Sequence, residues 1–143
     1  MSLQTKIQEI VKLYTDGYYK KAINEIDKLE NENIISPQLK NFKGLAYLAQ
    51  EEFGKAADFF NQAIFQDSKF FKAYNNYGIS LFRDGKFEKA LEKFNKAIKI
   101  KPDYAEAYNN KGILLNHIGK INEAIECFVV AIKKNPNFYN GIE

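Results

Sequence analysis

The feature that most constrains this chain is an internal repeat with a period of 34 residues. When the 143-residue sequence is shifted against itself by that length, small and aromatic residues coincide without a gap. The coincident sets are Gly44, Gly78 and Gly112; Ala56, Ala90 and Ala124; Phe60, Phe94 and Phe128; and Ala63, Ala97 and Ala131. A fixed period of about 20–50 residues is the signature of stacked structural repeats. We therefore predict an array of similar small units rather than one irregular domain.

The period divides nearly the whole chain into four repeats. Repeats 2, 3 and 4 match one another closely and run over 37–70, 71–104 and 105–138. Segment 3–36 fits the same frame more weakly, because it carries Ile10 where the others carry glycine. We interpret it as a divergent repeat 1, and residues 139–143 as a tail or the opening of a further repeat. The whole chain, 1–143, is then a single array.

Each repeat has the pattern of two helices joined by a turn. In repeat 3, apolar residues recur at helical spacing on both sides of Asp84-Gly85-Lys86, where glycine permits the backbone to end the first helix. Pro102 then ends the second helix. In repeat 2 the turn holds Glu51-Glu52 without a glycine, so we expect another turn geometry there. The four repeats together predict an all-α fold of about eight helices in antiparallel pairs.

The coincident small residues have a packing explanation. Gly78 and Ala90 lie where the two helices of repeat 3 would cross, and small side chains there let the backbones approach closely. Phe94 would fill the space between them, and Ala97 would pack against the following repeat. Such helix pairs cannot bury their apolar faces alone, so neighbouring repeats must stack.

The signature of repeat 3 resembles the tetratricopeptide repeat. The residues that carry the resemblance are Tyr74, Tyr77, Gly78, Leu81, Ala90, Phe94, Ala97 and Pro102. It extends over residues 3–138, and is closest in repeats 3 and 4. The resemblance implies an α-solenoid, a right-handed superhelix of antiparallel helix pairs whose concave groove is lined by the first helix of each pair.

The resemblance also assigns side chains to that groove. The assigned residues are Asn41, Leu45, Lys72, Asn75, Asn76, Ile79, Arg83, Asn109, Asn110, Ile113 and His117. An asparagine amide offers a donor and an acceptor, which complement the peptide backbone, so a row of asparagines could hold an extended segment of another protein. The alternative interpretation is that these asparagines only cap and link neighbouring helices.

A more specific function of the family can be compared with this sequence. Relatives that hold acidic chaperone tails use two lysines, two asparagines and an arginine across three repeats. The matching positions of repeats 2 to 4 hold Asn41, Leu45, Asn76, Glu106 and Asn110, and those of repeats 1 to 3 hold Ile7, Val11, Phe42, Lys72 and Asn76. Each alignment has a single agreement, so we expect no carboxylate clamp for chaperone tails.

The sequence gives little support for catalysis, a metal site or a cofactor. His117 is the only histidine and Cys127 the only cysteine, so neither a histidine pair nor a thiol pair is available for zinc. We expect ordinary packing for Cys127, which as a free cysteine behaves as a small hydrophobe. No glycine-rich phosphate loop, nucleophile elbow or kinase signature occurs. We therefore expect no enzymatic activity.

Charge and hydropathy argue against nucleic-acid and membrane binding. The net charge is +3, and the lysines of 86–101 alternate with Glu88 and Glu92, as on a solvated helix face. No uncharged apolar run approaches the ~20 residues that span a bilayer. The N-terminal residues lack the apolar core of a signal peptide. A single cysteine excludes an internal disulfide, and we expect a cytoplasmic protein.

The C-terminal repeat indicates a second possibility. No polar capping helix follows repeat 4, so Phe128, Ala131 and Ile132 are expected to leave an apolar edge. Three explanations of this edge stay open: the chain is cut from a longer array, it dimerises through the edge, or a partner covers the edge. Repeat 1, with Lys6 and Glu9, is the more polar end. The sequence thus predicts a scaffold that binds a peptide or helical segment of another protein in its groove. The alternative is a module that forms homo-oligomers through the C-terminal edge.

Overall fold

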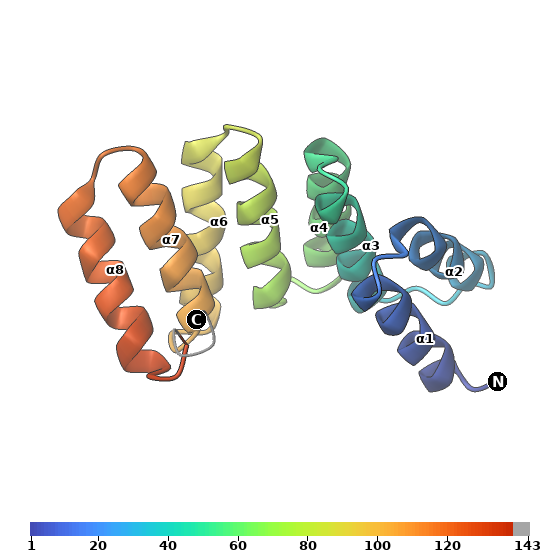
Figure 1. Ribbon diagram of the computed structural model, residues 1–143. Helices are drawn as coiled ribbons and strands as arrows, with labels where there is room; N and C mark the ends of the chain where they lie inside the picture. The colour runs from blue at the N-terminus through green and yellow to red at the C-terminus, as the bar shows by residue number, and fades with distance from the viewer. Residues whose placement is uncertain (139–143) are drawn as a thin grey trace. The chain divides into compact units, whose positions relative to one another are not determined.

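The computed structural model describes residues 1–138, and within that range it contains eight α-helices and no strand. The helices are α1 Leu3–Thr15, α2 Tyr19–Asn31, α3 Pro37–Ala49, α4 Phe53–Gln66, α5 Phe71–Arg83, α6 Phe87–Ile100, α7 Ala105–His117 and α8 Ile121–Lys134. Successive helices form one pair per repeat (Figure 1). The predicted all-α class and helix number are confirmed. The expectation for 139–143 falls outside the described residues.

The chain folds as two compact units. The N-terminal unit comprises residues 1–68 and contains α1 to α4, and the C-terminal unit begins at Lys69 and contains α5 to α8. The boundary falls two residues before the predicted junction of repeats 2 and 3. Each unit therefore corresponds to two repeats.

The close crossing of paired helices is confirmed in repeats 2, 3 and 4. A Cβ atom added to Gly78 would lie 2.5 Å from the Phe94 ring. Gly44 has the same relation to Phe60, at 2.5 Å, and Gly112 to Phe128, at 2.6 Å. In each pair the phenylalanine ring occupies the space that the missing side chain leaves, so the glycine and the phenylalanine act as one packing unit.

Repeat 1 solves the same packing problem with different residues. Ile10 stands at the glycine position and Ile26 at the phenylalanine position, and both are buried in one apolar cluster with Ala22, Leu29 and Leu39. A larger side chain on α1 thus accompanies a smaller one on α2. This exchange keeps the core filled, but it removes the glycine that allows close helix approach elsewhere.

The turn of repeat 2 corrects one expectation. Gly85 has φ +80°, and Glu51, at the equivalent place, has φ 61°, so both residues lie in the left-handed region. The hydrogen bonds also match. Gly85 N donates to Phe82 O at 3.0 Å, and Glu51 N donates to Leu48 O at 2.9 Å. The prediction of another geometry is therefore wrong, because Glu51 adopts the glycine-type backbone at a cost of about 1 kcal/mol.

An ion-pair network joins α2 to α3 in the N-terminal unit. The Lys43 Nζ atom lies 2.5 Å from Asp27 Oδ1 and 2.8 Å from Glu30 Oε1, and Lys40 Nζ lies 2.5 Å from Glu30 Oε2. The Lys43 ammonium also lies 4.6 Å above the Phe59 ring centroid. Lys40 and Lys43 stand where repeat 3 has Tyr74 and Tyr77, so at these two positions repeat 2 offers cations to the carboxylates of α2.

Candidate functional site

The best candidate site in the C-terminal unit is the face formed by the first helices, α5 and α7, which contact each other. On α5 this face carries Lys72, Asn76, Ile79 and Arg83, whose spacing of three and four residues aligns them on one side. On α7, Asn110, Ile113 and His117 have the same spacing, and Asn109 directly precedes Asn110 at the edge of the face. We call these eight residues the α5–α7 face. Lys72, Arg83, Ile113 and His117 are exposed, and the other four are partly exposed.

Asn75 does not belong to the exposed face. Its side chain is only 2% exposed, and its Oδ1 atom accepts a 3.0 Å hydrogen bond from Asn110 Nδ2. Asn75 therefore links α5 to α7 and presents no amide at the surface, contrary to its assignment as a lining residue. The physical reason is that Asn75 and Asn76 are adjacent in sequence, so they point about 100° apart around the helix.

Tyr104 continues the polar connection behind this face. Its hydroxyl donates to Glu106 Oε2 at 3.1 Å, and Asn75 is a further hydrogen-bond partner of the same hydroxyl group. Burial, and after it the negative charge of Glu106, raises the pKa of Tyr104 well above its usual value. The hydroxyl therefore stays protonated and keeps its bond to Glu106. Asn110, Asn75, Tyr104 and Glu106 form one continuous chain of hydrogen-bonded groups.

An aromatic cluster holds the other end of the face. The His117 ring centroid lies 5.4 Å from that of Phe82 and 5.0 Å from that of Phe87, and the two phenylalanine rings are 5.6 Å apart. Phe87 belongs to α6 and was not predicted as a site residue. Its signal in the sequence was the pair of phenylalanines on either side of the Asp84-Gly85-Lys86 turn. The cluster restricts the His117 ring at the end of α7.

The predicted site residues of repeat 2 lie on α3 in the N-terminal unit. Asn41 is buried, and Leu45 is half-buried. Asn41 therefore offers little side-chain surface to a ligand, in contrast to its predicted role. The exposed polar face predicted from the sequence is best developed on α5 and α7.

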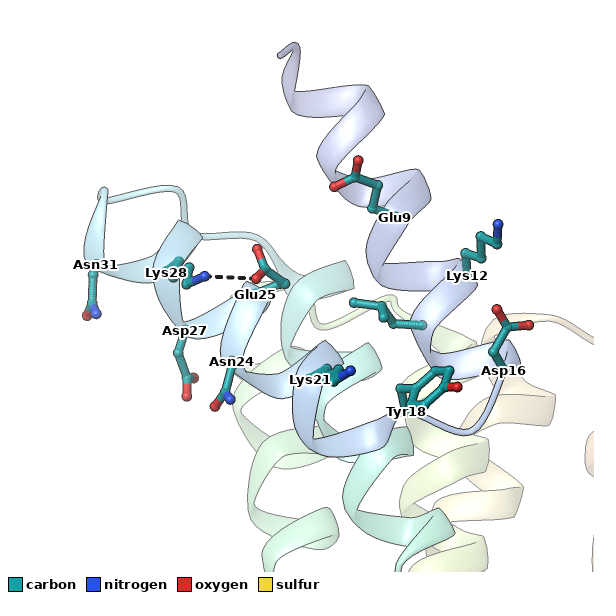
Figure 2. A pocket seen from close by; sticks show the side chains of 11 residues that line it. Glu9, Lys12, Asp16, Tyr18, Lys21, Asn24, Glu25, Asp27, Lys28 and Asn31 are labelled. Carbon is teal, nitrogen blue, oxygen red and sulfur yellow. Dashed lines mark hydrogen bonds and ion pairs between the residues drawn. The ribbon is translucent and has the colours of Figure 1, made fainter.

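A cleft of about 760 Å³ lies between α1 and α2 in the N-terminal unit, and it was not predicted. Figure 2 shows α1 rising away from α2 so that the space opens between them. Leu13 and Tyr18 are its largest apolar lining residues. The charged lining residues are Glu9, Lys12, Asp16, Lys21, Glu25, Asp27 and Lys28. Acidic and basic groups alternate there, so the cleft selects neither a cationic nor an anionic ligand.

The single histidine and the single cysteine of the sequence lie in different surroundings. His117 packs on Phe82 and Phe87, whereas Cys127 lies in an apolar cluster with Leu115 and Ala124. Burial raises the pKa of the Cys127 thiol, which keeps it protonated and unreactive near neutral pH. Within residues 1–138, no three histidine, cysteine or carboxylate side chains gather to form a metal site. None of the helices in this range has the length and apolar character that crossing a bilayer requires.

The structure corrects which residues form the predicted C-terminal edge. Ala131 is completely buried and Phe128 is half-buried against Gly112, so of the three predicted residues only Ile132 is exposed. The large exposed apolar side chains of this region are Ile118, Ile121, Ile125, Val129 and Ile132. The spacing of three and four residues between Ile121, Ile125, Val129 and Ile132 is the sequence signal that could have identified the four residues on α8.

Comparisons with known proteins agree with the helix-pair architecture. A family model described as "TPR repeat" matches residues 78–117, and one described as "Tetratricopeptide repeat" matches residues 105–138. No match was found among curated proteins. A crystal structure of MamA aligns with a TM-score of 0.81 at 24% identity, over 96% of this chain and 80% of that one.

Two further solved structures are similar in fold. MamA 41-end from Desulfovibrio magneticus RS-1 aligns with a TM-score of 0.82 at 18% identity, over 94% of this chain and 76% of that one. YrrB, described as a TPR protein with an unusual peptide-binding site, aligns with a TM-score of 0.78 at 20% identity. That alignment covers 91% of this chain and 67% of YrrB.

Proposed function

Because this chain is a protein of tandem tetratricopeptide repeats, we propose that it is an interaction scaffold whose α5–α7 face binds an extended or helical segment of another protein. The fold supports a role in protein binding in general. The assignment to this particular face rests on its own side chains. Residues on a rigid helical framework hold a binding geometry better than residues on loops.

The observation that carries the proposal is the position of Asn110 beside Ile113. The Asn110 amide is held by Asn75 and remains partly exposed, and Ile113, one turn away, is 43% exposed. A peptide segment offers a backbone amide to the first and an apolar side chain to the second. Since the hydrogen bond already restricts the Asn110 side chain, binding loses less side-chain entropy than it would with a mobile amide.

The charges around this face favour a neutral or acidic segment. Lys72 lies in the first turn of α5 and Arg83 at its end, and both side chains are exposed. Glu106 of α7, which stands 34 residues after Lys72, accepts the hydrogen bond of Tyr104. A segment with a carboxylate near either end would therefore meet a cation, whereas a basic segment would be repelled.

The test uses peptides selected against the purified protein from a random display library. Affinities of the selected peptides are measured by fluorescence anisotropy for the wild type and for an Asn76→Ala/Ile113→Glu variant. We expect the variant to bind at least about tenfold more weakly, since it loses an amide and an apolar contact. Lys96→Ala, an exposed change on α6, is the matched control and should bind as the wild type does. Equal binding by all three proteins would contradict the proposal.

A pull-down from native cell extract then identifies the natural partner. Proteins retained by the wild type and lost by the folded Asn76→Ala/Ile113→Glu variant are the candidates. Their segments can be synthesised and measured in the same anisotropy experiment. If the segment of a natural partner binds the wild type and the variant equally, that segment binds outside the α5–α7 face.

A second candidate function, self-association, is favoured by one specific observation. Four large apolar side chains of α8, Ile121, Ile125, Val129 and Ile132, are exposed. Contiguous apolar surface of this kind is typical of protein–protein contacts. The second candidate is therefore a module that assembles with copies of itself through its C-terminal helix.

A further inference from the structure

Four exposed side chains form a continuous apolar stripe on α8. Ile121, Ile125, Val129 and Ile132 are 57%, 53%, 42% and 47% exposed. Their spacing of four, four and three residues places them on one side of the helix, and Phe128 lies on the same side. We call these four residues the α8 stripe. Among the described residues of α5 to α8, it is the only long apolar helix face that no neighbouring helix covers.

The equivalent face one repeat earlier is a packing surface. Phe87, Leu91 and Ile98 of α6 stand 34 residues before Ile121, Ile125 and Ile132, and all three are partly buried. Leu114 of α7 belongs to the same apolar cluster as Phe87 and Leu91. The helix face that carries the α8 stripe is thus one that this fold uses to receive another helix.

We propose that the α8 stripe is covered by the α8 stripe of a second copy of this chain, in an antiparallel, two-fold symmetric helix pair. The proposal rests on the second candidate function and specifies its interface. A two-fold pair uses the same surface on both copies, so it closes at the dimer. Centring the pair between Phe128 and Val129 places Ile125 opposite the other copy's Ile132 and Phe128 opposite its Val129, and leaves Ile121 at the edge of the contact.

Charge complementarity supports the antiparallel arrangement. Glu126 and Lys133 are exposed and seven residues apart, so they lie on the same flank of the α8 stripe. A two-fold axis between antiparallel helices brings that flank of one copy against the same flank of the other. Glu126 of each copy then faces Lys133 of its neighbour, and the pairing occurs twice. In a parallel two-fold pair the same flanks of the two copies lie on opposite sides of the contact, so Glu126 of one copy would not meet Lys133 of the other.

Helix α1 of a second copy would cover the α8 stripe less well than α8 does. When α7 packs on α6 it buries Ala107 and Leu114, which are fully covered. The equivalent positions of α1 hold Thr5 and Lys12, both exposed. Docking α1 of a second copy on the stripe would place the Lys12 ammonium against isoleucine side chains, and burying an unpaired charge is costly. Pairing α8 with α8 of a second copy avoids burying this charge, whereas docking α1 on α8 does not.

The expected dimer is weak, because one fourteen-residue helix offers less than the ~800 Å² per partner of a standard interface. We expect a dissociation constant of about 10–100 µM. Sedimentation equilibrium from about 5 µM to about 500 µM spans that range and should show a monomer–dimer equilibrium with no larger species. Larger assemblies that grow with concentration would overturn the two-fold interface.

The central variant is Ile125→Asp/Ile132→Asp, whose two changed positions are exposed. We expect its dissociation constant to rise at least about 30-fold, with unchanged helicity by circular dichroism. The matched control is Ile35→Asp, an exposed isoleucine outside the helices, which should dimerise as the wild type does. A monomeric wild type over the whole range would overturn both this inference and the second candidate function. A wild-type dimer that survives the stripe variant would overturn this inference alone.

A charge exchange tests the antiparallel register. Glu126→Lys and Lys133→Glu are each expected to weaken the dimer about three- to tenfold at low ionic strength, since each sets like charges together. The double variant restores the opposite charges in exchanged places and should return to within about threefold of the wild type. Additive weakening in the double variant would overturn the antiparallel pairing.

Discussion

Asn110 donates a 3.0 Å hydrogen bond from α7 to Asn75 on α5. From the sequence, the asparagines could either bind a peptide or link neighbouring helices, and this contact bears on both roles. Asn75 links helices, whereas Asn110 links helices and also remains partly exposed beside Ile113. A conformationally fixed surface amide is thus a consequence of the same contact that joins repeats 3 and 4.

The first prediction concerns the stability cost of breaking this contact. Asn110→Ala leaves the buried Asn75 Oδ1 atom without its donor, which should lower the free energy of unfolding by about 1–3 kcal/mol. Asn76→Ala, a partly exposed neighbour, should cost distinctly less. Urea denaturation followed by circular dichroism measures both. Equal costs for the two substitutions would contradict the linking role of Asn110.

A second prediction addresses the packing of glycine against phenylalanine. Gly78→Ala puts a methyl group 2.5 Å from the Phe94 ring, so one helix must shift, and overpacking of this kind costs about 1–3 kcal/mol. Gly54→Ala is the control, because no atom lies within 4 Å of a Cβ at that position. It should be neutral or slightly stabilising, since alanine favours a helix. A thermal melt in which Gly78→Ala matches Gly54→Ala would contradict the proposed contact.

The third prediction follows from the backbone of Glu51. Its φ of 61° is unfavourable for a residue with a side chain, so Glu51→Gly should stabilise the protein by up to about 1 kcal/mol. Gly85→Ala imposes the reverse change at the equivalent turn, where φ is +80°, and should destabilise it by a similar amount. Chemical denaturation of the two variants provides the comparison. The idea fails if both substitutions shift stability in the same direction.

The repeat period predicted most of the fold because helices, turns and the Gly78–Phe94 crossing depend on local spacing. Side-chain direction was harder to predict. Asn75 and Asn76 look alike in sequence, yet a rotation of about 100° buries one and exposes the other. Ala131 was assigned to an exposed edge for the same reason, although it faces the core. Identity and spacing locate a helix more reliably than they locate each side chain around it.

Features that depend on departures from the repeat were not predicted. The cleft between α1 and α2 lies in repeat 1, which carries Ile10 where the other repeats have glycine. The ion pairs of Lys43 could not be inferred, because Asp27 and Glu30 belong to another helix and charged residues are common on helix surfaces. Such contacts become visible only once the packing of α2 on α3 is known.

The fourth prediction concerns the pH dependence of that network. Burial alone would raise the pKa of Glu30, but the hydrogen bonds and charges of Lys40 and Lys43 outweigh it and hold the pKa below its usual value of 4.5. The stabilisation is therefore present above about pH 4.5 and is lost as the pH falls through the lowered folded-state pKa. For Lys43 burial acts in the other direction and would lower the pKa, but the partners Asp27 and Glu30 outweigh it and raise the pKa above 10.5. The charge of Lys43 therefore stabilises the folded state until the pH rises through this raised pKa.

Glu30→Gln tests this account, because glutamine keeps the size of the side chain and removes its titration. We expect the variant to be less stable than the wild type at pH 7, where Lys43 loses a charged partner within 2.8 Å. The difference between the two proteins should narrow as the pH falls below about 4.5, because the wild-type carboxylate is then neutralised as well. Urea denaturation at several pH values measures the difference. Glu25→Gln, which removes an exposed ion pair with Lys28, should leave the acid dependence nearly unchanged. A constant gap between wild type and Glu30→Gln across this range would show that Glu30 stabilises the α2–α3 contact by packing rather than by charge.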